Sequence, residues 1–256
     1  MTTTDGPSPR LQRGRRSMSL TRALPARLAS LLLMACSSAG VGAGAPASAQ
    51  AGEEMFDEMW RAYSGVQTFE QHGRVTSVSV RGPKRDVSST TFSVSFERPE
   101  RIRFEFLVRA DHGSVHGLLW SQESSAEILL FDHRKTTPSI ADGAAELAGV
   151  SESSSWIASA LAARRPDSAA ATTHFQFLRD ETVEGSMCHV LVRRESRSSN
   201  TLWIDQRTHW LRRRLLESDI QPKDGDTTPL RIKITTAFDE PTVNMPIDPS
   251  HLRGEL

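Results

Sequence analysis

The neighbouring residues Cys188 and His189 are the pair of side chains best suited to chemistry, because a thiol beside an imidazole can act as a nucleophile with its base. They lie in an alternating apolar stretch, residues 188–194, which predicts a β-strand. Adjacent side chains on a strand point to opposite faces of the sheet. The two residues are therefore not expected to form a catalytic pair, and we predict that Cys188 is a small core residue.

A metal site is the second chemistry that the residue types suggest. His112 and His116 would share one face of a helix, at a spacing that suits zinc. Gly113 and Gly117 argue against a helix, and on a strand the two rings would lie ~13 Å apart. The sequence also contains no G-x-S-x-G, P-loop or H-E-x-x-H motif. We therefore predict no metal, no cofactor and no enzymatic activity.

The run Arg212-Arg213-Arg214 is the most basic feature of the chain outside its N-terminal segment. On a strand the three side chains alternate between faces, so they form no single basic surface unless a bulge intervenes. We expect solvated side chains or ion pairs here. The first 49 residues hold six arginines and one acidic residue, which leaves 25 basic and 30 acidic residues in the remainder. This acidic balance argues against nucleic acid as a partner.

Most of the remaining sequence has patterns that predict β-strands, and these strands must position the residues described above. The clearest signal is residues 91–109, where apolar and polar residues alternate on both sides of a short break. A period of two predicts two strands with one apolar and one polar face. Pro99 favours a turn between them, because proline presets φ and lacks an N–H group. The hairpin presents seven apolar side chains to one face: Phe92, Val94, Phe96, Ile102, Phe104, Phe106 and Val108.

Helices and further strands are predicted around this hairpin. Residues 53–65 form an amphipathic pattern, with Met55, Phe56, Met59, Trp60 and Tyr63 on one stripe. Two short helices are predicted near residues 144–148 and 156–161. The other predicted strands cover residues 68–80, 112–121, 126–132, 173–178, 188–194, 201–205, 210–217 and 230–237. Short connections predict an antiparallel meander, because sequential strands usually pair.

Residues 1–49 predict an export signal. The segment has arginines from Arg10 to Arg27, an apolar centre over residues 28–41, and an A-x-A cleavage site at residues 47–49 before Gln50. The apolar run is too short to favour a membrane span. In a second interpretation, residues 33–36 resemble a lipobox, which would place an acylated Cys36 at the mature N-terminus. Arg15-Arg16 leaves both the Sec and the twin-arginine route open.

Residues 50–256 predict one domain of mainly β (α+β) class. We expect an incomplete antiparallel β-barrel, or half-barrel, with an N-terminal helix and short lid helices over a hydrophobic cavity. Strand after strand supplies apolar side chains to one face, while about three short helices can cover it. Two interpretations remain open: an ordinary filled core, or a concave face that forms a lipid-sized cavity.

Two sequence motifs carry a resemblance to a known family. Residues 96–104, FERPERIRF, resemble the RP-x-x-[FI]-x-[WF] hairpin of periplasmic outer-membrane lipoprotein carriers, the LolA/LolB-like superfamily. Residues 201–205, TLWID, followed by residues 209–213, HWLRR, resemble the [LI]-W-[IV]-D…L-x-R segment of the same superfamily. The order of export signal, amphipathic helix, β-meander, helical insertion and further strands is similar as well.

The resemblance implies a carrier that holds the acyl chains of lipoproteins, or another lipid, for transfer to the outer membrane. It implies a periplasmic monomer, loaded by an inner-membrane donor and unloaded by an outer-membrane acceptor. The arginine before the hairpin proline, Arg98, would bond to the lid and hold it shut when the cavity is empty. The residues expected to contact lipid are Phe92, Val94, Phe96, Ile102, Phe104, Phe106 and Trp120.

The sequence departs from this family in two ways. Phe104 stands where several carriers have tryptophan, and Cys36 leaves open a membrane-anchored form like the acceptor proteins. A lipoprotein-sensing regulatory protein of the envelope is the alternative function, because some relatives use the same half-barrel in that way.

Overall fold

A computed structural model describes residues 47–111, 113–121, 125–162, 174–221 and 228–254. Most of the predicted export signal, with Cys36, lies outside these residues, and so does His112. Among the described helices none is long and apolar enough to cross a membrane.

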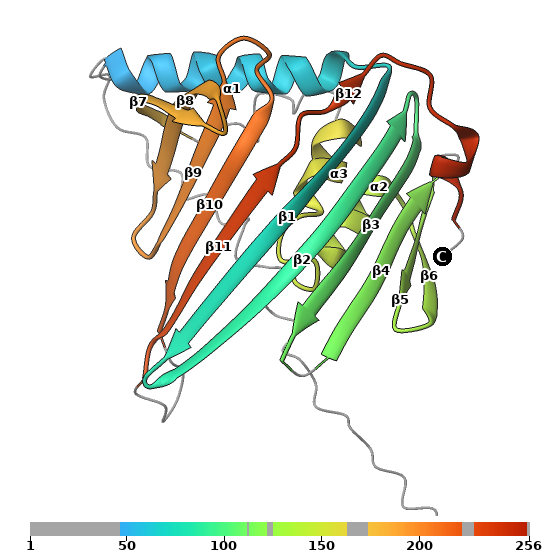
Figure 1. The fold of residues 1–256 in the computed structure, drawn as a ribbon, viewed down its shortest axis with the longest axis horizontal. Helices are drawn as coiled ribbons and strands as arrows, with labels where there is room; N and C mark the ends of the chain where they lie inside the picture. The colour runs from blue at the N-terminus through green and yellow to red at the C-terminus, as the bar shows by residue number, and fades with distance from the viewer. Residues whose placement is uncertain (1–46, 112, 122–124, 163–173, 222–227, 255–256) are drawn as a thin grey trace, which may run out of the picture. The chain divides into compact units, whose positions relative to one another are not determined.

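The described part of the domain is built on one antiparallel sheet with the strand order β6-β5-β4-β3-β2-β1-β11-β10-β9-β8-β7 (Figure 1). Within the described residues β6 and β7 stand at the two ends, so the sheet is open, and the predicted mainly β fold class is confirmed. The strands are β1 (Thr68–Arg81), β2 (Lys84–Glu97), β3 (Arg101–Ala110), β4 (Gly113–Ser121), β5 (Ala126–Leu130), β6 (His133–Thr137), β7 (Gln176–Val183), β8 (Ser186–Arg194), β9 (Ser198–Asp205), β10 (Leu211–Ile220) and β11 (Leu230–Phe238). A twelfth, two-residue strand, β12 (Thr242–Val243), pairs with β1.

The predicted hairpin of residues 91–109 is formed by β2 and β3. Phe92 lies opposite Phe106, Val94 opposite Phe104, and Phe96 opposite Ile102. Directly opposed residues of an antiparallel pair project from the same face, so these six side chains form one continuous apolar surface. β2 begins earlier than predicted, at Lys84, because its polar first half pairs with the second half of β1, from Val75 to Arg81.

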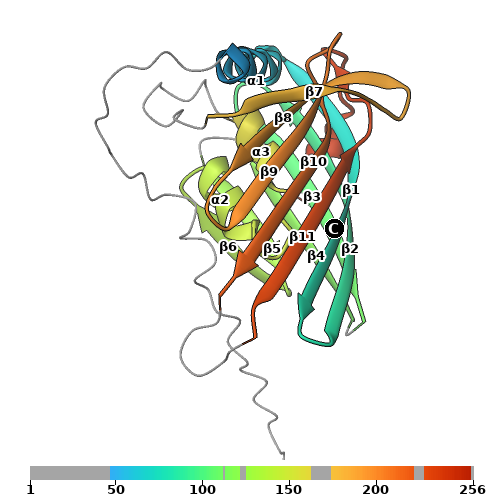
Figure 2. The same cartoon turned by 90° about the vertical axis from the view of Figure 1, so that its left-hand side faces the viewer.

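Three helices lie on this side of the sheet: α1 (Ala47–Gly65), α2 (Ile140–Leu147) and α3 (Trp156–Ala162) (Figure 2). α1 contacts β7 and β8, α2 contacts β4 and β5, and α3 contacts β2. Ser139 caps α2 by accepting a hydrogen bond from the backbone N–H of Asp142. α1 begins six residues before the predicted start, at Ala47. Its added turn packs closely on the sheet, because a Cβ at Gly52 would lie 2.3 Å from the carbonyl oxygen of Phe175.

Two strands were not predicted, β6 and the two-residue β12. β6 has the sequence HRKTT, which carries no apolar alternation, and its pairing with β5 is what makes it a strand. Polar, charged side chains are typical of a strand at the edge of a sheet, where they discourage pairing with other chains.

The C-terminal tail lies across the outer face of the sheet. The short 3₁₀-helix η2 (Pro249–Leu252) contacts β2 and β3, and Leu252 is buried there. Arg103 of β3 donates a hydrogen bond to the carbonyl oxygen of Arg253. This tail therefore shields part of the sheet on the side opposite the helices.

Candidate functional site

The apolar face of β2 and β3 is closed over in this structure. Phe96, Ile102 and Phe104 have no exposed area, and Phe92, Val94 and Phe106 are almost as fully buried. The rings of Phe92 and Phe104 lie 6.1 Å apart, and those of Phe104 and Phe106 lie 5.8 Å apart. Side chains of all three helices complete the same cluster, including Tyr63, Leu147 and Leu161. A ligand could reach this face only if the covering helices moved.

Trp120 does not belong to this face, and its predicted place among the lipid-contacting residues is wrong. On β4, Gly117 and Leu119 lie opposite Phe106 and Phe104, whereas Trp120 lies opposite Arg103. Its ring therefore projects from the outer face, where the guanidinium of Arg134 stacks over it at 4.9 Å. A Cβ at Gly254 would lie 2.2 Å from its indole nitrogen, so the C-terminal tail covers it.

Arg98, predicted as the lid switch, joins two helix ends. Its Nε donates to the carbonyl of Val66 at 2.7 Å, and its Nη2 donates to the carbonyls of Ser64 at 2.7 Å and Tyr63 at 3.4 Å. The same Nη2 lies 3.4 Å from the carbonyl of Leu161, in the last turn of α3. Carbonyls in the last turn of a helix have no partner within the helix, so a guanidinium with five donors satisfies several of them at once.

We call residues 140–162, which hold α2, α3 and their connection, the lid. A second contact fastens the lid to the sheet at Glu152, which sequence reasoning did not single out. The Glu152 carboxylate accepts a hydrogen bond from the hydroxyl of Thr90 at 2.7 Å and another from the hydroxyl of Ser88. Both hydroxyls belong to β2. Glu152 lies in the α2–α3 connection and has a φ of 53°, which is uncommon for a residue with a side chain.

The arginine run of residues 212–214 departs from the prediction of solvated side chains. The register between β9 and β10 shifts between Leu211 and Arg213, which is the mark of a β-bulge at Arg212. Arg213 then lies opposite Trp203 on the outer face, and Arg214 lies opposite Leu202 on the face that the helices cover. Burial, with a smaller contribution from the positive charge of Arg193, lowers the pKa of Arg214 to about 10.

Cys188 and His189 project from opposite faces of β8, as predicted. Cys188 lies opposite Asp205, has no exposed area, and packs with Val190 and Trp203. Burial raises the pKa of its thiol to about 11, which keeps it protonated at neutral pH. His189 instead bonds Asp180 through Nδ1 at 2.8 Å. Within the part of the chain that the structure describes, no group of three His, Cys, Asp or Glu side chains is placed to hold a metal ion.

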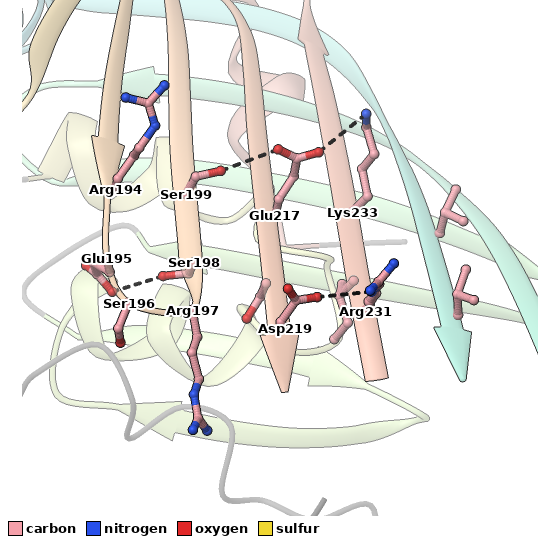
Figure 3. A pocket seen from close by; sticks show the side chains of 14 residues that line it. Arg194, Glu195, Ser196, Arg197, Ser198, Ser199, Glu217, Asp219, Arg231 and Lys233 are labelled. Atoms are coloured by element: carbon pink, nitrogen blue, oxygen red, sulfur yellow. Dashed lines mark hydrogen bonds and ion pairs between the residues drawn. The ribbon is translucent and has the colours of Figure 1, made fainter. Parts of the chain in front are cut away.

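A shallow groove of about 590 Å³ lies across the ends of β8 to β11 and β1 (Figure 3). Opposite charges pair across its strands: Lys233 with Glu217 at 3.5 Å and Arg231 with Asp219 at 3.6 Å. These side chains are about half or more exposed to solvent, and ion pairs in such positions contribute little to stability. The groove is therefore a solvated polar surface, with no convergent set of groups for catalysis.

The described part of the protein is therefore an open antiparallel sheet with helices packed on its apolar face. Arg98 and Glu152 make the hydrogen bonds that fasten these helices. No protein-family model matches the chain, and no curated protein matches it either.

Solved structures do resemble the fold. LprF from Mycobacterium bovis is 10% identical over 80% of this chain and 97% of its own, with a TM-score of 0.39. A putative outer membrane lipoprotein-sorting protein domain from Vibrio parahaemolyticus is 10% identical over 80% and 97%, with a TM-score of 0.38. The MucA/MucB complex of Pseudomonas aeruginosa contains a chain that is 12% identical over 80% of this chain and 61% of its own, with a TM-score of 0.34. These are distant likenesses in fold alone.

Proposed function

We propose that this protein is a periplasmic carrier that binds the acyl chains of lipoproteins, or of another lipid, on the face between sheet and lid. The observation that carries the proposal is the contact of Arg98 with the ends of both α1 and α3. The resemblance of the Arg98-Pro99 hairpin to that of the lipoprotein carriers implies the same contact. A single side chain that bridges two helix ends can hold a cover in place and can also release it.

The energetics suit a carrier that must both bind and release its cargo. Burying one CH₂ group contributes ~0.8 kcal/mol, so a full acyl chain contributes on the order of 10 kcal/mol. The closed and empty state gains the hydrogen bonds of Arg98 and Glu152 and the burial of the phenylalanine cluster. These contacts offset part of the binding energy of the lipid, so that an acceptor can remove it. No cofactor or covalent step is required.

The proposal includes a location and partners. We propose export through a signal that is cut after Ala49, loading by an inner-membrane donor, and unloading to an outer-membrane acceptor. A lipoprotein anchored through Cys36 is the other form that the sequence allows.

Native mass spectrometry of the protein purified from its own cell envelope tests this proposal. We expect a chain that begins at Gln50 and carries one acylated molecule, which is lost when the protein is mixed with acceptor membranes. A mass that matches diacylated Cys36 would refute the soluble form. A protein that is free of lipid and takes up no added fatty acid or lipopeptide would refute the carrier function.

A further inference from the structure

Two arginines and an asparagine lie side by side on the lid-covered face of the sheet, away from the phenylalanine cluster. Arg193 of β8 lies opposite Asn200 of β9, and Arg214 of β10 lies opposite Leu202, two residues further along β9. Leu202 and Leu191 belong to the buried core, and residues two apart on a strand share a face. Arg193, Asn200 and Arg214 therefore all project toward the helices.

Each of the two guanidinium groups lies over an aromatic ring. Arg214 lies over the ring of Trp156, the first residue of α3, at 5.7 Å, and Arg193 lies over the ring of Phe175 at 5.9 Å. These rings in turn contact α1, because Trp156 lies 5.9 Å from Trp60 and Phe175 lies 4.7 Å from Phe56. The positive charges therefore sit at the border of the apolar cluster and not in open solvent.

In the described part of the protein, few hydrogen-bond acceptors and only one carboxylate contact the two guanidinium groups. The only hydrogen bond of Arg214 there runs from its Nε to the side-chain oxygen of Asn200 at 3.2 Å, and no carboxylate pairs with it. Arg193 pairs with Glu195 at 3.0 Å, but its Nε is buried without a hydrogen-bond partner. A guanidinium has five N–H donors, and a buried donor without an acceptor is costly. An anion placed between the two arginines would satisfy these donors.

We propose that Arg193 and Arg214 bind the anionic head, a phosphate or a carboxylate, of an amphiphile whose acyl chain occupies the apolar face of β2 and β3. The proposal rests on the carrier function and specifies its ligand as anionic. β10 is three strands from β2, on the order of 14 Å along the sheet, which an acyl chain can span. Guanidinium groups suit both kinds of head, because their planar fork matches phosphate and carboxylate oxygens.

The experiment compares amphiphiles that share one acyl chain but differ in the head. The probes are a fatty acid, its neutral methyl ester, a lysophosphatidylglycerol and a neutral monoacylglycerol. The proteins are the parent, the double variant Arg193→Gln/Arg214→Gln, and the control variant Arg213→Gln. Arg213 stacks on Trp203 at 5.6 Å on the outer face, so its removal tests the loss of an arginine from the same strand without touching the site.

We expect the parent to bind at least one anionic probe about ten-fold or more tightly than its neutral counterpart. The free energy of one charge-assisted hydrogen bond corresponds to a change of about that factor in the dissociation constant. The double variant should lose this preference and bind the neutral probes as the parent does, whereas Arg213→Gln should keep it. A preference for the fatty acid alone or for the lysolipid alone identifies the head as carboxylate or phosphate. Equal binding of charged and neutral probes by the parent, or an unchanged preference in the double variant, would overturn the anion site and leave the carrier function standing. Failure to bind any probe would overturn both.

Discussion

Replacing Arg98 with leucine is expected to slow the transfer of a bound lipid to acceptor membranes by about ten-fold or more. A hydrogen bond to a charged group contributes roughly 1.5–3 kcal/mol, and Arg98 makes several to the ends of α1 and α3. Leucine removes these bonds from the closed, empty state but adds no polar group that would repel an acyl chain. Binding should therefore persist, and the variant should accumulate in its loaded form.

The measurement is a transfer assay in which equally loaded proteins are mixed with acceptor membranes. Arg101→Leu is the matched control, because Arg101 lies in the same hairpin and pairs with Glu97, at 2.5 Å, in a half-exposed position. We expect the control to transfer lipid at the parent rate. If Arg98→Leu also transferred at that rate, the contacts of Arg98 would serve stability alone.

Replacing Phe104 with aspartate is expected to abolish lipid uptake while the sheet remains folded. Phe104 has no exposed area, and an unpaired carboxylate buried among apolar side chains costs several kcal/mol. The lid is held by its packing on this cluster and by a small number of hydrogen bonds, and the carrier function requires that it can lift away. A lid that lifts away lets water reach the carboxylate. The variant should then keep its β-sheet signal in circular dichroism, expose the lid to proteolysis, and bind no fluorescent fatty acid.

Phe104→Leu is the control for this change, because it stays apolar and loses only part of the ring's volume. It should keep both the fold and lipid uptake, with a modest loss of stability. If Phe104→Asp instead unfolded the whole domain, the cluster would be a permanently sealed core, and the interpretation of an ordinary filled core would stand.

The central hairpin could be predicted from sequence because its local signals agree. Alternation fixed the face of Phe92, Val94 and Phe96, and Pro99 fixed the position of the turn. The register followed, because a slip by one residue would turn every apolar side chain to the other face. The contact of Arg98 with the lid was reached through the resemblance to the carriers and not through any local pattern.

The sequence could not show which face of the sheet Trp120 and Arg214 occupy, because in both strands the simple alternation of faces breaks down. The last five residues of β4, from Gly117 to Ser121, are all buried. α2 lies on one face of β4, and the C-terminal tail covers Trp120 on the other. Without alternation nothing in the sequence could assign Trp120 to a face. On β10 a single bulge at Arg212 shifts the parity, so that Arg214 and not Arg213 faces the lid.

The role of Glu152 could not be predicted because it depends on contacts between distant segments. Glu152 lies in a serine-rich turn, and its partners Ser88 and Thr90 are more than sixty positions earlier. The signal is a carboxylate between two short helices, which the sequence does not distinguish from a solvated loop residue. Only the packing of the lid on β2 brings these residues together.

The most direct test of the account is to prevent the lid from moving. Ser88→Cys and Glu152→Cys replace the two partners of one lid contact, and a short bismaleimide would join them covalently. Cys188 should not react, because it is buried and its pKa is raised to about 11, and Cys36→Ser removes the other cysteine. Each single cysteine variant treated with the same reagent is the control. We predict that the cross-linked protein takes up no lipid while the controls do. Uptake by the cross-linked protein at the rate of the controls would contradict binding between the lid and the sheet.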